Sequence, residues 1–206
     1  MARALVTGGT RGIGAAIVAE LQYIGYWTYT FSRASGHDVT KQEDRNRVKD
    51  FVGHCDILVN CVGGGGRYGT IEEVWAKNVV AMTDFTQWAL SGMAQRKWGR
   101  VITISSIHGR ECGSRPSFMA AKAAQIAYMK GLSRGEFARH GITFNTVAPG
   151  NVLVEGKPKV NEEALPMGRM GRPEEVAKLV AFLCSEDAAW INGACIVIDG
   201  GESVAI

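Results

Sequence analysis

Short apolar runs alternate along the chain with longer stretches in which apolar residues recur every three or four positions. The short runs are rich in β-branched and aromatic residues, a composition that predicts buried strands. They cover residues 4–7, 26–31, 56–60, 100–106, 142–150 and 194–201. The longer stretches predict helices, and the first has Ile13, Ile17, Leu21 and Ile24 on one face, with Gly25 placed to cap it. Similar patterns cover residues 74–93, 120–138 and 174–185.

The alternation of predicted strands and helices sets the fold class. Strands joined through a helix pair in parallel, and such units place helices on both faces of one sheet. The sequence therefore predicts an α/β protein with a doubly wound parallel sheet of the Rossmann type, in a shortened form. A chain of 206 residues is enough for one such core, so we expect a single domain over residues 1–206.

Charge and cysteine content narrow the class of partner. The formal net charge is +3, from 23 basic and 20 acidic residues, which is too small and too scattered to indicate a nucleic-acid partner. The five cysteines form no Cys-x-x-Cys pair, which favours buried reduced thiols over disulfides or a metal site. No apolar stretch approaches the roughly 20 residues of a membrane span, and the N-terminus does not resemble a signal peptide. We expect a cytoplasmic protein that acts on a small molecule and binds neither nucleic acid nor membrane.

A glycine-rich segment, "TGGTRGIG" at residues 7–14, lies between the first predicted strand and the first predicted helix. Glycines there allow a tight turn close to a pyrophosphate, while the helix N-terminus supplies free N–H groups and a partial positive charge. This context predicts a dinucleotide site rather than a purely structural turn. The second predicted strand ends in Ser32 and Arg33, with no acidic residue before Asp38. Arg33 together with Arg11 suits a 2′-phosphate, so we expect NADP(H) rather than NAD(H).

Further short motifs follow the glycine segment in a fixed order. They are Asp38-Val39, "NCVG" at 60–63, Asn78, "ISS" at 104–106, Lys122, Pro149-Gly150, "GRPEEVA" from Gly171 and "DGG" at 199–201. With these motifs, the chain resembles the short-chain dehydrogenase/reductase family from Ala4 to about Gly201. The resemblance implies a Rossmann-type fold, a nicotinamide cofactor, hydride transfer on a carbonyl/alcohol pair, and a homo-oligomer, often a tetramer.

The resemblance also implies which residues line the cofactor. Asp38 and Val39 would touch the adenine, and residues 60–63 would lie along the cofactor. The expected cofactor-binding set is Gly8, Thr10, Arg11, Gly12, Ile13, Gly14, Ser32, Arg33, Asp38, Val39, Asn60, Val62, Gly63, Lys122, Pro149, Gly150 and Val152. Val154 stands near the place where a threonine of the family contacts the nicotinamide carboxamide, so this contact is not expected here.

The family's catalytic set is Asn, Ser, Tyr and Lys, which corresponds here to Asn78, Ser106, Phe118 and Lys122. In the family the tyrosine hydroxyl gives a proton to the carbonyl oxygen, and the lysine charge lowers the pKa of that phenol. Phe118 has no hydroxyl, so we expect carbonyl reduction to be weakened by about 10²–10⁴-fold while cofactor and substrate still bind. The alternative function is a binding or regulatory module that needs NADP(H) but performs no chemistry.

Three interpretations of Phe118 remain open. It is a designed Tyr→Phe change, a natural divergence that gave up reduction, or a change compensated by another acid, His108 or Tyr68. The intact remainder of the catalytic set favours the designed change. For His108 and Tyr68, a surface or core role is the simpler interpretation.

Two connections are short for the family. Residues 32–37 leave no room for the helix usual there, and residues 151–170 give a short substrate lid, which predicts an open cleft. The nearby basic residues are Arg67, Arg110, Arg115, Lys157 and Lys159. They predict an anionic substrate, such as a carboxylate or a phosphopantetheine-linked acyl group, although a solvated basic rim fits the same pattern.

Small residues share one face of the predicted helix 120–138. They are Ala120, Ala123, Ala124 and Ala127. Small side chains allow close helix packing, so this face suits an intersubunit seam, and packing on the protein's own sheet would give the same pattern.

Overall fold

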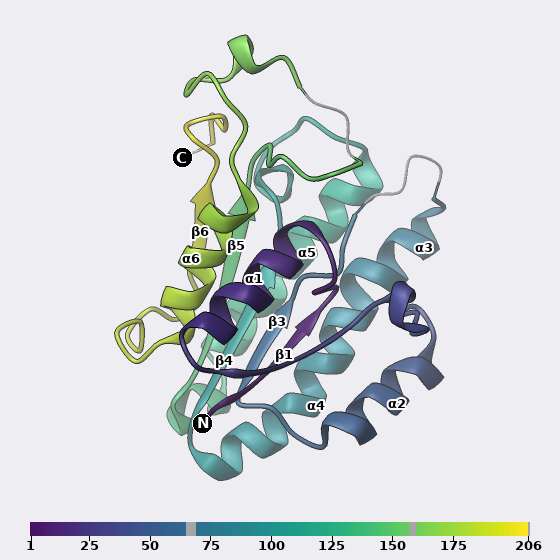
Figure 1. Cartoon of the computed structure of the whole chain (residues 1–206), viewed down its shortest axis with the longest axis vertical. Coiled ribbons are helices and arrows are strands. Elements are labelled where there is room, and N and C mark those ends of the chain that lie inside the picture. The colour runs from purple at the N-terminus through teal and green to yellow at the C-terminus, as the bar shows by residue number, and fades with distance from the viewer. Residues whose placement is uncertain (65–68, 157–159, 206) are drawn as a thin grey trace.

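The computed structural model describes residues 1–64, 69–156 and 160–205 (Figure 1). A sheet of six parallel strands forms its centre, in the order β2-β1-β3-β4-β5-β6. The strands are β1 Arg3–Thr7, β2 Trp27–Phe31, β3 Ile57–Asn60, β4 Gly99–Ile104, β5 Ile142–Pro149 and β6 Cys195–Ile198. The chain runs outward from β1 to β2 and then returns past β1 to β3. All six predicted strands and the doubly wound Rossmann-type sheet are therefore confirmed.

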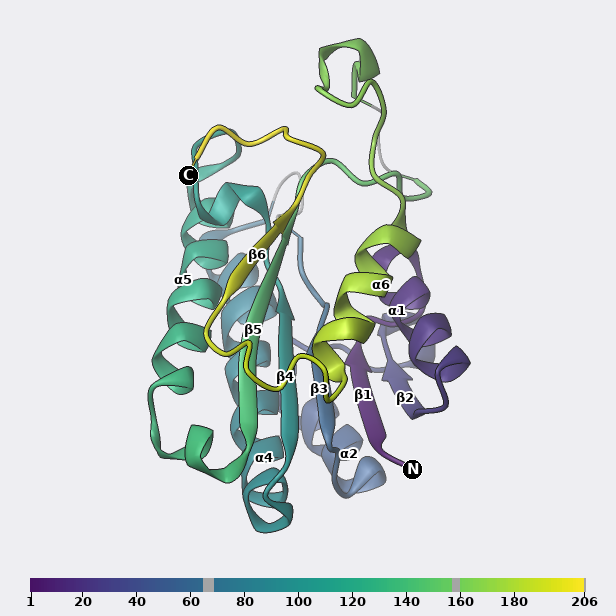
Figure 2. The ribbon, with the colours of Figure 1, turned by 90° about the vertical axis from the view of Figure 1, so that its left-hand side faces the viewer.

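Helices cover both faces of this sheet (Figure 2). On one face lie α1 Gly12–Tyr23 and α6 Pro173–Cys184, and on the other lie α2 Gln42–Val52, α4 Ala81–Arg96 and α5 Pro116–Ser133. Ile17 and Val180 belong to the core of the first face, and Phe85 and Met129 to the core of the second. Strands β1 and β3 are buried on both sides, and their middle residues are short continuous apolar runs.

Shorter helical segments complete the fold. They are η1 Arg33–Ser35, α3 Ile71–Trp75, the π-helix η2 Ala76–Val80, η3 Ile107–Gly109, η4 Glu136–His140 and η5 Glu162–Ala164. The single 3₁₀ turn η1 between β2 and residue 38 confirms the predicted short connection. No helix in the described ranges combines the length and the apolar character needed to cross a membrane.

The helix predictions differ from the structure at α2 and α5. Helix α2 was not predicted, because six of its eleven residues are charged and the apolar pattern is weak. Helix α5 begins at Pro116, which suits a first-turn position, and it ends at Ser133 just before Gly135. The predicted continuation to residue 138 is a separate 3₁₀ segment. Gly25 follows α1 with a φ of 92°, which confirms its place at the helix end.

All five cysteines lie in the described part of the chain and are free thiols. Burial raises the pKa of Cys55 and of Cys184 to about 12, so both are unreactive neutral thiols. Cys61 and Cys195 are half-buried. Cys112 is exposed, and for this residue the expectation of burial is wrong.

Candidate functional site

The predicted site residues follow the carboxyl ends of the parallel strands. Gly8 follows β1, Ser32 follows β2, Cys61 follows β3, Ser105 follows β4 and Gly150 follows β5. In a parallel sheet all these ends meet at one edge, which is where open α/β sheets bind their ligands.

The loop between β1 and α1 is folded too tightly for side chains at its glycines. Gly8 and Gly12 have φ values of 72° and 53°, in the left-handed region that favours glycine. A Cβ atom on Gly14 would lie 2.3 Å from the Gly8 carbonyl oxygen, so α1 starts directly against the loop. Arg11 is the N-cap of α1, and its side chain makes no capping bond to the first turn. Ile13 packs into the core beneath α1.

The end of β2 is joined to this glycine loop. Thr10 Oγ1 donates a hydrogen bond to Ser32 Oγ at 2.9 Å. Ser32 also caps η1 by accepting from the Ala34 N–H at 3.1 Å. Arg33 begins that turn and is exposed, as is Arg11. Two exposed guanidinium groups therefore stand on neighbouring loops at this edge.

Residues 38–41, here called the strap, connect η1 to α2. Asp38 Oδ1 accepts hydrogen bonds from the Thr40 N–H at 2.9 Å and from Thr40 Oγ1 at 2.8 Å. The N–H bond is the main cause of a pKa of Asp38 below its usual value, and the charge of Arg33 adds to it. Val39 is 5% exposed and lies close to Thr7 and Val62. The strap thus lies beside the ends of β1 and β3.

The loop after β3 is fixed by β1. Thr7 Oγ1 accepts hydrogen bonds from the N–H groups of Cys61 at 3.0 Å and Val62 at 3.2 Å. Asn60 Nδ2 donates to Thr86 Oγ1 at 3.1 Å, and its buried Oδ1 has no hydrogen-bond partner among the described residues.

Lys122, Asn78 and Gly63 meet at the sheet edge. A Cβ atom on Gly63 would lie 3.0 Å from both Asn78 Oδ1 and Lys122 Nζ, so a side chain at this position would crowd both groups. Lys122 is 4% exposed, and its Nζ donates to the Ile104 carbonyl at 2.9 Å and to Gln125 Oε1 at 3.0 Å. The ammonium group is therefore held between α5 and the end of β4.

Ser106 and Phe118 lie beside this lysine. Ser106 is the N-cap of η3, and its Oγ accepts a hydrogen bond from the His108 N–H at 3.2 Å. The preceding Ser105 donates its hydroxyl to the Lys122 carbonyl at 3.0 Å, which joins this segment to α5. Phe118 is half-buried, and its ring centroid is 5.6 Å from Lys122 Nζ. A hydroxyl on that ring would stand close to a positive charge.

Asn78 sits in an irregular part of its helix. It lies in the π-helix Ala76–Val80 between α3 and α4, and such π-turns are frequent at functional sites. Gln125 Nε2 donates to the Asn78 carbonyl at 2.7 Å while its Oε1 accepts from Lys122. Sequence reasoning missed Gln125, although a position three residues after Lys122 on the same helix face was a usable signal.

The loop after β5 is held by the C-terminal segment. The N–H of Asn151 donates to Glu202 Oε2 at 2.7 Å, and a Cβ atom on Gly150 would lie 2.5 Å from that oxygen. Val152 is buried and forms a bridge with Gly171. A Cβ atom on Gly12 would lie 2.7 Å from Val154 Cγ1, so this valine packs against the glycine loop. Pro149 is buried at the end of β5. Sequence reasoning did not identify Glu202.

The remaining predicted residues make no side-chain hydrogen bond to the site residues above or lie outside the described residues. Arg67, Tyr68, Lys157 and Lys159 lie outside the described residues. The ring of His108 packs against Gly113, and its Nδ1 is buried without a hydrogen-bond partner in the described ranges. Ala120, Ala123 and Ala127 are exposed and Ala124 is half-buried.

The known proteins that this chain resembles in sequence are described as reductases. A family model described as enoyl-(acyl carrier protein) reductase matches residues 28–203. The chain is 35% identical to acetoacetyl-CoA reductase from Rhizobium meliloti (strain 1021), with 98% of each chain covered. It is 31% identical to 3-oxoacyl-[acyl-carrier-protein] reductase FabG from Haemophilus influenzae, with 96% of each covered.

Solved structures give the same picture. The TT0495 protein from Thermus thermophilus is 31% identical with a TM-score of 0.82, covering 96% of this chain and 97% of that one. The structure of gox2181 is 28% identical with a TM-score of 0.86, covering 98% and 96%. The alignment with the Rhizobium reductase runs over 238 positions, more than the 206 residues here, so that relative has stretches without a counterpart in this chain. The chain belongs to the short-chain dehydrogenase/reductase family, as its motifs predicted.

Proposed function

We propose that this chain, as one domain over residues 1–206, binds NADP(H) along the carboxyl edge of its sheet. Two places in the edge suit such a group: the side-chain-free turn at Gly8, Gly12 and Gly14, and the glycine at position 63 between Asn78 and Lys122. The first matches a pyrophosphate at a helix N-terminus. At the second, the missing side chain of Gly63 lets the backbone after β3 pass close to Asn78 and Lys122.

We assign a different set of residues at this edge to each part of the dinucleotide. The turn of α1 holds the pyrophosphate, Ser32 with Arg33 and Arg11 holds the 2′-phosphate, and Asp38 with Val39 contacts the adenine. Asn60, Val62 and Gly63 follow the cofactor toward the nicotinamide, which Pro149, Gly150 and Val152 border together with Lys122. The support for this assignment is that these residues, apart from Lys122, lie at the carboxyl ends of β1, β2, β3 and β5 or on the segments that follow them. Lys122 is on α5 and its Nζ donates to the Ile104 carbonyl at the end of β4.

The reaction we propose is hydride transfer between the nicotinamide and a carbonyl/alcohol pair, with the cofactor supplying the hydride. Ser106 orients the substrate oxygen, and Lys122 holds the nicotinamide ribose. Asn78 holds a water molecule that relays protons. The observation that carries this proposal is the close approach of Asn78 Oδ1 and Lys122 Nζ to the backbone at Gly63, where a Cβ atom would lie 3.0 Å from each. Ser105, the residue before Ser106, donates its hydroxyl to the Lys122 carbonyl and so joins that segment to α5.

Phe118 changes what this site can do. Its ring occupies the place of the proton donor, 5.6 Å from Lys122 Nζ, but carries no proton to give. We therefore propose an oxidoreductase scaffold whose reductase activity is strongly diminished. The alternative is an NADP(H)-dependent binding or regulatory module without chemistry, and Phe118 is consistent with it too. Titration with NADPH and NADH tests the part that both share. Association with NADPH is expected, and a folded protein that binds neither nucleotide refutes both.

Replacing Arg33 with alanine is expected to weaken NADPH binding by about tenfold to a hundredfold, because a charge-assisted bond to the 2′-phosphate is lost. NADH has no such phosphate, so its affinity should stay within about twofold of the unmodified chain. Arg139→Ala removes another exposed arginine, in η4, and serves as the matched control. Equal weakening of NADPH and NADH by Arg33→Ala would contradict the assignment.

The substrate we propose is an anionic carbonyl compound or an acyl group on a phosphopantetheine carrier. Two relatives are named as reductases of acetoacetyl-CoA and of 3-oxoacyl groups on the acyl carrier protein, and both substrates carry that arm. Among the described basic residues, Arg110 is half-buried and Arg115 is exposed near the start of α5.

A 3-keto acid is expected to bind the protein–NADPH complex about tenfold more tightly than its neutral methyl ester, because an arginine at the rim favours the carboxylate. Competition binding with the two compounds measures this difference. Equal affinities for the acid and the ester would show that the protein does not recognise the negative charge of the substrate.

We also propose a homo-oligomer, a dimer or tetramer. The alanine face of α5 supports it, because Ala120, Ala123 and Ala127 are exposed rather than packed on the sheet. Light scattering of the full chain measures the assembly, and a monomer at all concentrations contradicts it.

A further inference from the structure

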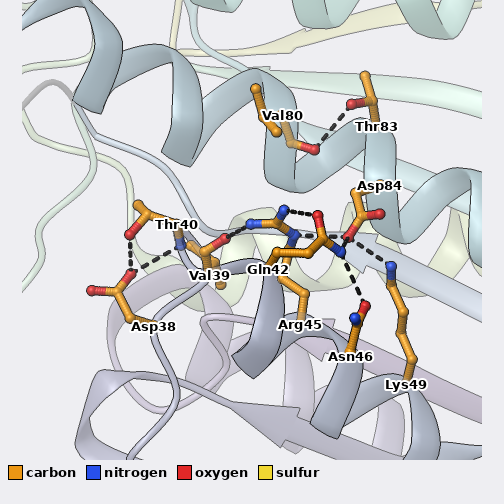
Figure 3. A network of polar contacts seen from close by, with 10 residues as sticks. All are labelled: Asp38, Val39, Thr40, Gln42, Arg45, Asn46, Lys49, Val80, Thr83 and Asp84. Atoms are coloured by element: carbon orange, nitrogen blue, oxygen red, sulfur yellow. Dashed lines mark hydrogen bonds and ion pairs between the residues drawn. The ribbon is translucent and has the colours of Figure 1, made fainter.

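A buried arginine holds the strap formed by residues 38–41 (Figure 3). Arg45, at the start of α2, is only 3% exposed. Its Nη1 donates a hydrogen bond of 2.6 Å to the Val39 carbonyl oxygen, and its Nε donates one of 2.7 Å to Asp84 Oδ2 on α4. Its Nη2 donates to Gln42 Oε1. The guanidinium group therefore links the strap to two helices.

Asp84 fixes the orientation of this arginine. Lys49 Nζ also donates to Asp84 Oδ2, at 2.6 Å, so two cations share one carboxylate oxygen. Burial by itself raises the pKa of Asp84, but the hydrogen bonds from Lys49 and Arg45 outweigh it, and the pKa lies below its usual value. The carboxylate is therefore charged at neutral pH and keeps both partners bound.

A second hydrogen bond connects the strap to α2, the helix that carries Arg45. The Asp38 N–H donates a hydrogen bond to Asp44 Oδ2 at 2.8 Å. Upstream, the strap follows a single 3₁₀ turn rather than a helix. The position of the strap consequently depends on α2, and the position of α2 against α4 depends on Asp84.

We propose that Arg45, oriented by Asp84, is a positioning residue for the adenosine half of the cofactor. The inference rests on the proposed function, because it requires NADP(H) to lie against Asp38 and Val39. Arg45 itself touches no part of the nucleotide. It fixes the Val39 carbonyl, and through this peptide it fixes the Thr40 N–H that binds the Asp38 carboxylate. Asp38 and Val39 are thereby kept in the positions in which they meet the adenine.

Arg45→Met keeps the length of the side chain and removes its donors. We expect the dissociation constants for NADPH, NADH and adenosine 2′,5′-bisphosphate to rise together by about tenfold, the equivalent of one lost charge-assisted hydrogen bond. The ratio of NADPH to NADH affinity should stay unchanged, because Arg11 and Arg33, which we assign to the 2′-phosphate, are intact. Arg45→Lys, which retains a charge beside Asp84, should recover part of the loss.

A matched control separates positioning from general loss of structure. Arg100 is also buried, at 2% exposure, and pairs with Glu186, but it lies in the first residues of β4 at the opposite edge of the sheet. Arg100→Met should lower the free energy of unfolding yet leave the three dissociation constants within about twofold. Calorimetric titration at a temperature where urea unfolding shows each variant to be folded makes the comparison.

Joint weakening by Arg45→Met, without weakening by Arg100→Met, supports the proposal. Unchanged binding in Arg45→Met, equal weakening in both variants, or an effect on NADPH alone overturns it. Should Arg45→Met not fold, Asp84→Asn decides instead, with a loss of about threefold expected for all three ligands and unchanged binding overturning the proposal. Failure of the proposed function is seen separately, as absence of NADPH binding by the unmodified chain.

Discussion

Replacing Phe118 with tyrosine is expected to raise NADPH-dependent reduction of acetoacetyl-CoA by about 10²–10⁴-fold, the usual contribution of a positioned general acid. The ring already lies 5.6 Å from Lys122 Nζ, which is itself held by the Ile104 carbonyl and Gln125. The new hydroxyl would therefore meet a fixed positive charge, and its pKa should fall below the ordinary value near 10. Measurement of kcat/KM for both chains between pH 6 and 10 tests the change.

The pH profile identifies the group responsible. A phenol that must be protonated to give up its proton makes reduction fall as the pH rises through its pKa, so the Phe118→Tyr chain should lose activity on the alkaline side. The unmodified chain should show no such limb. Lys122→Met added to Phe118→Tyr should abolish the gain, because the phenol loses the neighbouring charge.

Controls distinguish the alternatives for this position. Phe137→Tyr, in the half-buried part of η4, adds a hydroxyl away from the sheet edge and should leave activity unchanged. NADPH binding by Phe118→Tyr with no reduction across a panel of ketones favours the binding or regulatory module. Substantial activity of the unmodified chain, lost on His108→Ala, instead assigns the proton to His108.

The fold could be predicted from sequence where burial on both faces leaves a continuous apolar run. Strands β1 and β3 are such runs, and their residues Leu5 and Leu58 are completely buried. Helix α2 could not, because only Val48 and Val52 bury apolar side chains, while charged Arg45 and Asp44 are buried with them. A sequence does not reveal that Arg45 is neutralised by Asp84, thirty-nine positions away. Tertiary ion pairing, rather than local pattern, places this helix.

The candidate site divides in the same way. Its glycines, Lys122 and Asn78 could be found because family motifs record them at fixed spacing. The π-helix around Asn78 and the bridge through Gln125 could not, since both depend on how α4 and α5 pack. Glu202 belongs to no motif, and only the folded chain places it on Asn151.

Gly14→Ala is expected to destabilise the protein by about 2–3 kcal/mol and to weaken NADPH binding by at least about a hundredfold. A Cβ atom at this position would lie 2.3 Å from the Gly8 carbonyl oxygen and 2.9 Å from the Gly8 carbonyl carbon. Both are backbone atoms, so no side chain can turn aside to relieve the overlap. The loop and the first turn of α1 must move apart, and these are the two parts proposed to hold the pyrophosphate.

The matched variant is Gly131→Ala, because this glycine is also helical but, apart from the backbone of its own helix and its chain neighbours, nothing lies within 4 Å of its would-be Cβ. Alanine lowers the backbone entropy of the unfolded chain and favours helix, so this change should stabilise the protein by about 0.5–1 kcal/mol. Urea unfolding of both variants measures the two changes in the free energy of unfolding, which should have opposite signs. NADPH titration shows which variant loses affinity. A Gly14→Ala protein as stable and as tightly binding as the Gly131→Ala protein would show that α1 can retreat from Gly8 without cost, and the close approach of helix and loop would then have no part in holding a cofactor.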